Sequence, residues 1–313
     1  MARKGLHLDG VVLLDKPSGL TSNGALQRVK RLLGAAKAGH TGTLDPLATG
    51  LLPLCFGEAT KFAAGLLDAD KEYEAVVQLG SATTTGDAEG EVVFRGELSR
   101  VAERIGGILR DLSGHQQQIP PMFSAIKHQG RPLYEYARSG QTIERRSRQI
   151  TIHELTLLSC SADVLELRTR VSKGTYIRTL AEEIGTRLGC GAHLKALRRT
   201  RVGAFSLSLA VRLDQLEAAS TDARLAWLQP PDLLLTGLPR LDLDGDGAVA
   251  VIRGRAITIP SAQAWGDGSG MVRLYDSSGA FLGLGEIVGE AGEVVPKRLV
   301  SQAHRQSASE ATR

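Results

Sequence analysis

The sequence has few cysteines and no long apolar run. Its three cysteines, Cys55, Cys160 and Cys190, are odd in number and widely spaced. This pattern indicates neither a disulfide framework nor a metal knuckle, and it fits a reducing cytoplasm. No stretch approaches the roughly 18 consecutive apolar residues of a membrane-spanning helix. The apolar segment 11–14 is too short for the core of a signal peptide. We therefore expect a cytoplasmic protein without membrane association.

Two loops resemble nucleotide or metal sites, but each lacks an essential ligand. Gly34 and Gly39 have the spacing of a phosphate-binding loop, yet His40 stands where that loop needs lysine. A helical pattern precedes them, whereas a phosphate-binding loop follows a strand. The segment 242–247 resembles the start of a calcium loop, but its twelfth position is Arg253 and supplies no bidentate carboxylate. We expect neither a cofactor nor a bound metal.

The positive charge is concentrated in two segments. The chain has 313 residues and a net charge of +4. Residues 127–148 contain six Lys or Arg against two Glu, and residues 168–201 contain nine against two. The remainder is therefore net acidic, and such concentrated positive charge is typical of a protein that binds a polyanion. A solvated basic helix face would give the same pattern, so charge alone leaves both interpretations open.

Residues 39–61 surround one isolated carboxylate. Asp45 is the only ionised side chain between His40 and Glu58. Pro46 biases Asp45 toward extended or turn geometry, and nearby glycines let a bulky ligand approach the backbone. Four leucines (47, 51, 52 and 54) are expected to anchor the loop in a core. A carboxylate in apolar surroundings has few competing partners and suits a nucleophile, although most Asp-Pro pairs simply form turns.

The run GHTGTLDPLATG at 39–50 closely resembles the signature of the TruB family of tRNA pseudouridine-55 synthases. The resemblance implies that Asp45 is the catalytic carboxylate and that no cofactor is needed. It also implies that His40 enters the T-loop of tRNA in place of the target base. The expected partner is the tRNA T-stem-loop, with no guide RNA and no obligate protein partner.

Further segments extend the resemblance over most of residues 10–200. Residues 11–19 read as a buried strand that ends in a turn. The resemblance implies that this turn packs under the catalytic loop, with Lys16 either structural or in contact with phosphate. Residues 71–80 alternate like a strand with one buried face. The family places base-stacking tyrosines at Tyr73 and Tyr176, an arginine that pairs with the carboxylate at Arg178, and an apolar contact to the base at Leu197.

An insert at about 118–148 resembles the loop with which the family clamps RNA. The matching residues are 118–127 and 133–138, with Phe123 where the family commonly has Tyr. Stacking would survive that change, whereas a hydroxyl contact would not. The residues that we expect to contact RNA are Lys16, Phe123, Lys127, Arg138 and Lys173.

The order of elements predicts an α+β fold with a mixed, mostly antiparallel sheet and flanking helices. Two helices are predicted: one capped by residues 21–23 and stopped at Gly34, and one from Ile177 to Gly189. We expect a catalytic domain at 1–240, a small PUA-like RNA-binding β-barrel at 241–301, and a disordered tail at 302–313.

The predicted reaction isomerises uridine 55 of tRNA to pseudouridine, after the base has been flipped out of the T-loop. Asp45 would attack covalently, either at C1′ of the ribose or at C6 of the base. Arg178 would keep Asp45 ionised, and Tyr73 would stack on the uracil and help to remove the C5 proton. Assistance in tRNA folding is a possible second activity.

Three other functions are compatible with parts of the sequence. A guide-RNA-dependent synthase shares the Asp45 loop, but the basic insert favours the stand-alone family. A protein that only folds RNA would not need Asp45, Tyr73, Tyr176 and Arg178 together. A carboxylate glycosidase usually needs a second carboxylate, and the motifs supply only one.

Overall fold

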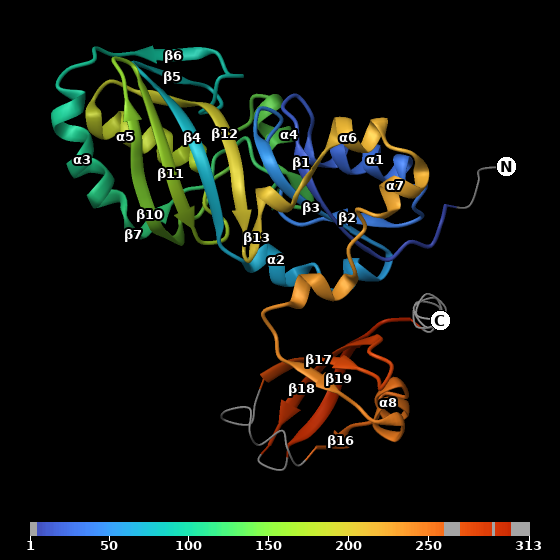
Figure 1. Ribbon diagram of the computed structural model, residues 1–313. Helices are drawn as coiled ribbons and strands as arrows, with labels where there is room; N and C mark the ends of the chain where they lie inside the picture. The colour runs from blue at the N-terminus through green and yellow to red at the C-terminus, as the bar shows by residue number, and fades with distance from the viewer. Residues whose placement is uncertain (1–4, 260–269, 290–291, 302–313) are drawn as a thin grey trace.

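A large mixed sheet forms the centre of the computed structural model, which describes residues 5–259, 270–289 and 292–301 (Figure 1). The strand order is β14-β1-β3-β12-β4-β11-β10-β7, with β13 paired to β12 and β2 paired to β3. Two pairs, β1–β14 and β3–β12, are parallel, and the others are antiparallel, which confirms the predicted fold class. The strands are β1 (Gly10–Lys16), β2 (Ala38–His40), β3 (Thr49–Phe56), β4 (Lys71–Leu79), β7 (Gly114–Gln118), β10 (Arg148–Cys160), β11 (Val164–Val171), β12 (Ala192–Val202), β13 (Phe205–Ser206) and β14 (Val211–Arg212).

Helices flank this sheet at both ends. Helices α3 and α5 pack against each other and against β10 and β12, while α1 and α6 lie together near the edge that carries β1 and β14 (Figure 1). The helices are α1 (Ser22–Leu32), α2 (Ala64–Asp68), α3 (Val101–Leu112), α4 (Leu133–Arg138), α5 (Ile177–Leu188), α6 (Leu213–Ala218), α7 (Thr221–Leu225) and α8 (Gly245–Ile252), with 3₁₀ turns η1 (Gly57–Lys61), η2 (Leu207–Leu209) and η3 (Pro231–Leu235). No helix among the described residues has the length and apolarity needed to span a membrane.

Strand β1 is apolar on both faces because each face packs into a different core. Val12 and Leu14 join the main core between the sheet and its helices. Val11 and Leu13 point the other way and join a second cluster. Successive side chains of a strand face opposite sides, so a continuous apolar run is required here. The predicted buried strand is confirmed.

Strands β4 and β11 alternate as predicted. Tyr73 and every second residue after it to Leu79 are buried on one face of β4. On β11, Glu166, Arg168 and Arg170 lie on the more exposed face. This alternation indicates that the pair covers the main core with one face only.

Helix α1 begins at its predicted cap and α5 ends at its predicted glycine, whereas α1 ends at Leu32, two residues before Gly34. The Thr21 hydroxyl oxygen accepts a hydrogen bond from the Gly24 N–H at 2.9 Å and caps α1. Gly189 ends α5 with a φ of 82°, in the left-handed region that favours glycine. The start of α5 therefore falls next to Tyr176 and Arg178.

The C-terminal part forms a separate five-stranded sheet, a curled half-barrel with α8 beside it (Figure 1). The expected small β-domain is therefore present, whereas the predicted disordered tail at 302–313 lies outside the described residues. The strands, in spatial order, are β15 (Arg240–Asp242), β17 (Gly270–Tyr275), β18 (Phe281–Val288), β19 (Glu293–Leu299) and β16 (Ile257–Thr258). Two hairpins complete the fold: β5 (Ser81–Thr83) with β6 (Val92–Arg95), and β8 (Lys127–His128) with β9 (Arg131–Pro132).

Candidate active site

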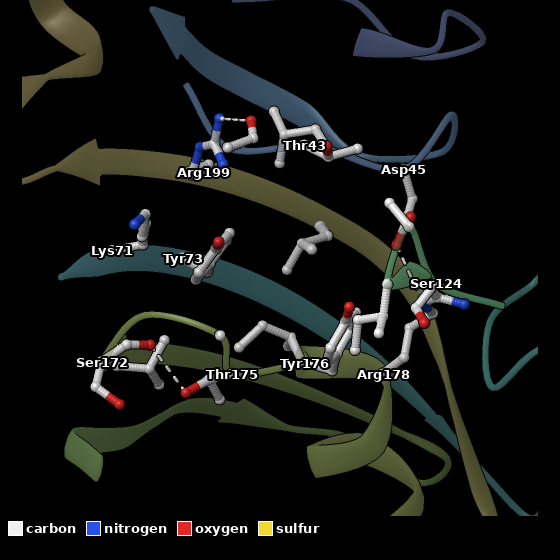
Figure 2. A pocket seen from close by; sticks show the side chains of 18 of the residues that line it. Thr43, Asp45, Lys71, Tyr73, Ser124, Ser172, Thr175, Tyr176, Arg178 and Arg199 are labelled. Carbon is white, nitrogen blue, oxygen red and sulfur yellow. Dashed lines mark hydrogen bonds and ion pairs between the residues drawn. The ribbon is translucent and has the colours of Figure 1, made fainter. Parts of the chain in front are cut away.

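A cavity of about 340 Å³ lies over the large sheet, between the β2–β3 loop and the start of α5 (Figure 2). It collects side chains that are far apart in the sequence. The loop contributes Asp45, β4 contributes Tyr73, the start of α5 contributes Tyr176 and Arg178, and β12 contributes Leu197. All five were predicted site residues, and the fold brings them to one cavity.

The Asp45 loop is held by the segment that joins β1 to α1. The Ser22 hydroxyl accepts a hydrogen bond from the Leu44 N–H at 2.7 Å and donates to the Leu44 carbonyl at 3.0 Å. The Pro46 carbonyl accepts hydrogen bonds from the Gly19 N–H at 2.9 Å and from Lys16 Nζ at 3.4 Å. The backbone on both sides of Asp45 is therefore fixed by the β1 turn, as the resemblance implied.

The core beneath this loop differs from the prediction at one position. Leu51 and Leu54 are fully buried as expected, but Leu47 is only half-buried. Leu44 and Ala48 are buried instead, at 3% and 0% exposure. The turn at Asp45 directs Leu44 and Ala48 inward, so part of the anchor lies on the N-terminal side of the carboxylate, where the leucine pattern did not indicate it.

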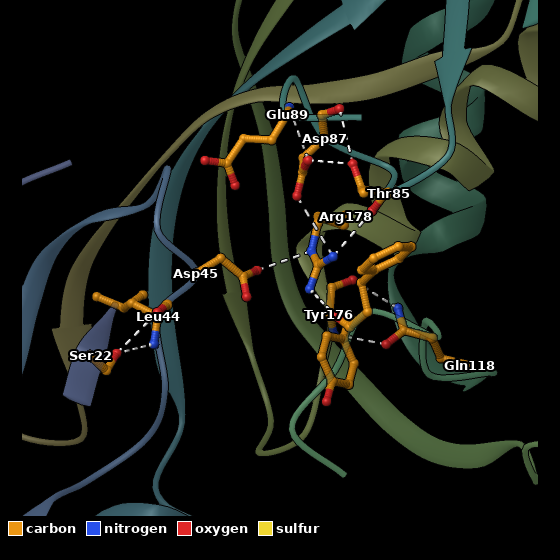
Figure 3. A network of polar contacts seen from close by, with 10 residues as sticks. Ser22, Leu44, Asp45, Thr85, Asp87, Glu89, Gln118, Tyr176 and Arg178 are labelled. Carbon is orange, nitrogen blue, oxygen red and sulfur yellow. Dashed lines mark hydrogen bonds and ion pairs between the residues drawn. The ribbon is translucent and has the colours of Figure 1, made fainter. Parts of the chain in front are cut away.

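Arg178 joins the loop to the rest of the site (Figure 3). Its Nε lies 3.0 Å from Asp45 Oδ2, the ion pair that the resemblance implied. Its Nη1 donates to the Thr85 carbonyl at 3.1 Å, and its Nη2 donates to the Phe123 carbonyl at 2.6 Å. Only 4% of the Arg178 side chain is exposed. A planar guanidinium with all three nitrogens engaged is a rigid partner for the carboxylate.

A second carboxylate, Asp87, also faces Arg178 and was missed from the sequence. Its Oδ2 lies 3.7 Å from Arg178 Nη1. Asp87 is buried, and its Oδ1 accepts hydrogen bonds from the Thr85 hydroxyl at 2.5 Å and the Glu89 N–H at 3.1 Å. The segment reads as an ordinary polar turn, and no local pattern indicated that it folds back onto α5.

Burial and charge act in opposite directions on Asp45. Burial raises the pKa of the Asp45 carboxyl above its ordinary value, and the nearby Asp87 adds to the rise. Arg178 and Lys16 oppose it by favouring the ionised form. The net shift of the Asp45 pKa is upward, so Arg178 offsets only part of the effect of burial. A carboxylate that is partly shielded from water and held by a cation is suited to nucleophilic attack.

Two buried cations form the end of the cavity beside Tyr73. Arg199 donates from Nε to the Leu51 carbonyl at 2.7 Å and from Nη2 to the Gly42 carbonyl at 3.2 Å. Complete burial lowers the pKa of Arg199, and a hydrogen bond with the Tyr73 side chain opposes that effect. Burial also lowers the pKa of Lys71 to about 8. Neither cation was predicted as a site residue, because basic residues at these positions also fit a strand end and a charged face.

The structure corrects the expectation that Lys16 contacts RNA. Lys16 is fully buried, and its ammonium group donates to the Pro17 carbonyl at 2.9 Å and the Leu20 carbonyl at 2.6 Å, besides Pro46. Burial lowers the pKa of Lys16 to about 8. An ammonium enclosed by carbonyls is not available to phosphate, so Lys16 has the structural role that the sequence left as the alternative.

His40 lies on β2 next to the cavity but is not among its lining residues. Burial lowers the pKa of its imidazole, and the nearby Arg199 lowers it further. Its Nδ1 is buried without a hydrogen-bond partner among the described residues. Of the remaining predicted RNA contacts, Phe123, Lys127 and Arg138 lie on the insert, and Lys173 lies between β11 and α5. Phe123 is half-buried, and the three basic residues are exposed.

Comparison with known proteins gives consistent matches along the chain. Residues 30–177 match the family model of the TruB family pseudouridylate synthase N-terminal domain. Residues 178–235 match the tRNA pseudouridylate synthase B C-terminal domain, and residues 239–300 match the C-terminal domain of pseudouridine synthase II TruB.

Curated relatives are similar over nearly their whole length. The tRNA pseudouridine synthase B of Azoarcus sp. (strain BH72) is 53% identical over 294 residues, which cover 94% of this chain and 95% of the relative. The tRNA pseudouridine synthase B of Burkholderia mallei (strain NCTC 10247) is 52% identical over 302 residues, covering 96% and 99%.

Among solved structures, a chain of a Cbf5-Nop10-Gar1 complex superposes with a TM-score of 0.69 at 26% identity, covering 93% of this chain and 84% of that chain. A chain of the archaeal box H/ACA sRNP Nop10-Cbf5 complex gives a TM-score of 0.67 at 27% identity, covering 94% and 86%. The family models, the curated relatives and the fold agree, and the chain therefore belongs to the TruB family of pseudouridylate synthases.

Proposed function

We propose that this protein isomerises uridine 55 in the T-loop of tRNA to pseudouridine, with Asp45 as the covalent catalyst. The observation that carries the proposal is the ion pair between Asp45 and the buried Arg178 in a cavity lined by Tyr73, Tyr176 and Leu197. The curated relatives are tRNA pseudouridine synthase B proteins, and this supports the same substrate class.

The reaction breaks the N1–C1′ bond of uridine, rotates the uracil, and joins C5 to C1′. Covalent attack by Asp45 at C1′ or at C6 divides this into two easier steps. Arg178 orients the carboxylate and favours its ionised form, while the surrounding apolar side chains limit its hydration. Tyr73 and Leu197 line the same cavity and would contact the uracil, and Tyr73 is the candidate for removal of the C5 proton.

The target base must leave its stack to reach this cavity, which costs a few kcal/mol. Stacking on Tyr176 and occupation of the vacated position by His40 would offset part of that cost. Phe123, Lys127, Arg138 and Lys173 would contact RNA around the cavity, and residues 241–301 would add a PUA-like RNA-binding domain. Exposed basic side chains of this kind make tRNA affinity depend on salt.

We also propose that the enzyme acts without guide RNA or partner proteins. The matched solved chains come from complexes that contain Nop10 and, in one case, also Gar1, but their identity to this chain is 26–27%. The curated tRNA pseudouridine synthase B proteins are 52–53% identical over almost the full length. The higher similarity favours the stand-alone mode.

The test is release of tritium from tRNA that carries C5-labelled uridine, with purified protein and no guide RNA or cofactor. Wild type should release tritium, and Asp45→Asn should lower the rate by about 10³-fold or more, because the amide cannot act as the nucleophile.

Asp45→Asn should still bind tRNA, and it should retain any RNA-folding activity. Sequencing of the product locates the modified uridine. If wild-type protein binds tRNA but releases no tritium, the stand-alone synthase assignment is wrong. Equal release by wild type and Asp45→Asn would remove Asp45 from the mechanism.

A further inference from the structure

The two ends of the insert meet beside Tyr176. Gln118 is the last residue of β7, Arg148 is the first residue of β10, and the two are direct register partners in the sheet. The insert at 119–147 therefore leaves the large sheet and returns to it at one point, next to the start of α5.

The Gln118 side chain binds the peptide groups of Tyr176 in both directions (Figure 3). Its Oε1 accepts a hydrogen bond from the Tyr176 N–H at 2.8 Å, and its Nε2 donates to the Tyr176 carbonyl at 3.1 Å. Gln118 is 7% exposed. The amide carries its donor and its acceptor on separate atoms, so both hydrogen bonds form at once and fix the orientation of the side chain.

Arg148 contacts the aromatic ring of Tyr176. Its guanidinium carbon lies 4.8 Å from the centre of the Tyr176 ring, and its Nη2 donates to the Gly174 carbonyl. A guanidinium over an aromatic face is an attractive contact that also fixes the ring plane. Gln118 thus holds the backbone of Tyr176 while Arg148 holds its side chain.

The position of Tyr176 sets the position of Arg178. Tyr176 is the N-cap of α5, and no side chain of its own caps the helix. Its carbonyl also accepts the first helical hydrogen bond, from the Leu180 N–H at 3.2 Å. Fixing this peptide fixes the first turn of α5, on which Arg178 lies. The insert contacts Arg178 directly as well, through the Phe123 carbonyl.

We propose that Gln118 and Arg148 are positioning residues for catalysis. They hold Tyr176 and, through the first turn of α5, they place Arg178 against Asp45. This inference rests on the proposed function. It also couples substrate binding to catalysis, because RNA that seats the insert acts on the same two residues that set the catalytic ion pair.

The experiment compares single-turnover tritium release at saturating tRNA with tRNA affinity measured by filter binding. Gln118→Met keeps the side-chain length but removes both hydrogen bonds. It should lower the single-turnover rate by about tenfold or more, because small displacements at a reacting centre are costly. The Kd for tRNA should stay within about twofold, since Gln118 is not placed to contact RNA.

Gln117→Met is the matched control. Gln117 is exposed on the same strand, and no hydrogen bond of its side chain is among those described. Its rate and affinity should equal those of wild type. If Gln118→Met destabilises the fold, Gln118→Glu replaces it, since the ionised carboxylate keeps the size but cannot donate to the Tyr176 carbonyl. Its rate should also fall.

The second end of the insert is tested with Arg148→Met against Arg146→Met. Both remove one positive charge, but Arg146 is exposed and only Arg148 stacks on Tyr176. Arg148→Met should lower the single-turnover rate, whereas Arg146→Met should affect only affinity.

A double variant separates positioning from general stability. In an Arg178→Lys background, Gln118→Met should lower the rate by less than about twofold, because both changes disturb the same ion pair. A folded Gln118→Met protein with a wild-type single-turnover rate would overturn the inference, as would a loss confined to affinity. Absence of tritium release by wild type would instead overturn the proposed function, and the inference with it.

Discussion

At the scale of single residues, the site depends on a carboxylate whose environment works against its charge. Burial raises the pKa of Asp45, and Arg178 counteracts this only in part. Because Asp45, the proposed nucleophile, must be ionised to attack, activity should fall as pH decreases through the pKa of Asp45. That pKa lies above the ordinary value, so the acid limb should appear at higher pH than for an exposed aspartate.

Arg178→Lys should move this acid limb to still higher pH. Lysine keeps the charge but loses the planar fork, so the ionised form of Asp45 is stabilised less and its pKa rises further. The rate near neutral pH should fall by about 10²-fold, as for loss of one preorganised donor.

The measurement is a pH profile of single-turnover tritium release for both proteins. Arg187→Lys is the control, since Arg187 lies on the same helix and is paired with Glu183 at the surface. An unchanged acid limb in Arg178→Lys would show that Arg178 does not set the charge state of Asp45.

At the scale of elements, two neighbouring residues at the start of α1 have different roles. Thr21 caps the helix, whereas Ser22 binds the peptide groups of Leu44, next to Asp45. Ser22 is 1% exposed. Its removal leaves a buried N–H and a buried carbonyl without their partner, which is a larger penalty than loss of an exposed cap.

Thr21→Ala should lower the free energy of unfolding by about 1 kcal/mol and leave the catalytic rate unchanged. Ser22→Ala should lower it by about 1–3 kcal/mol. It should also lower the single-turnover rate by about tenfold, because the Asp45 loop loses its alignment. Denaturant unfolding and tritium release measure the two effects. Equal rates in both variants would contradict a positioning role for Ser22.

At the scale of the whole molecule, the C-terminal sheet is packed onto the large domain and not merely tethered to it. Phe281 lies edge-on to Phe62 with ring centres 5.4 Å apart, within a cluster that also contains Val11 and Leu51. The Tyr275 hydroxyl donates to Asp232 Oδ2 at 2.5 Å. An interface with an apolar core and polar contacts of this kind favours a fixed arrangement.

Phe281→Ala should weaken this attachment without unfolding the small sheet. Loss of the ring should lower the free energy of unfolding by about 3–5 kcal/mol. The tRNA Kd should rise while the single-turnover rate at saturation stays unchanged, because the candidate active site lies on the large sheet. Filter binding, denaturant unfolding and limited proteolysis near Pro239 measure these outcomes.

Leu282→Ala is the informative comparison. Leu282 is the next residue on β18 and packs into the separate core of the small sheet. It should unfold that sheet rather than detach it, which circular dichroism distinguishes. Identical behaviour of the two variants would mean that the interface is not an independent unit.

The sequence by itself determined the fold class and the strand patterns, and it indicated residues that the fold brings to one cavity. Alternation along β4, the cap at Thr21 and the stop at Gly189 are local properties, so they can be read from neighbouring residues. The Asp45 motif is long enough to indicate the family, and with it the pairing of Asp45 with Arg178 that the structure contains.

Only the tertiary structure decided which side chains share a buried environment. Lys16 is enclosed by carbonyls, Asp87 reaches Arg178 from a turn 91 positions away, and Gln118 binds Tyr176 across 58 positions. None of these contacts has a local pattern, because a single lysine, aspartate or glutamine is equally common at an exposed turn or strand end. The burial of such a side chain and the identity of its partner depend on how distant strands pair. This pairing is a property of the whole chain.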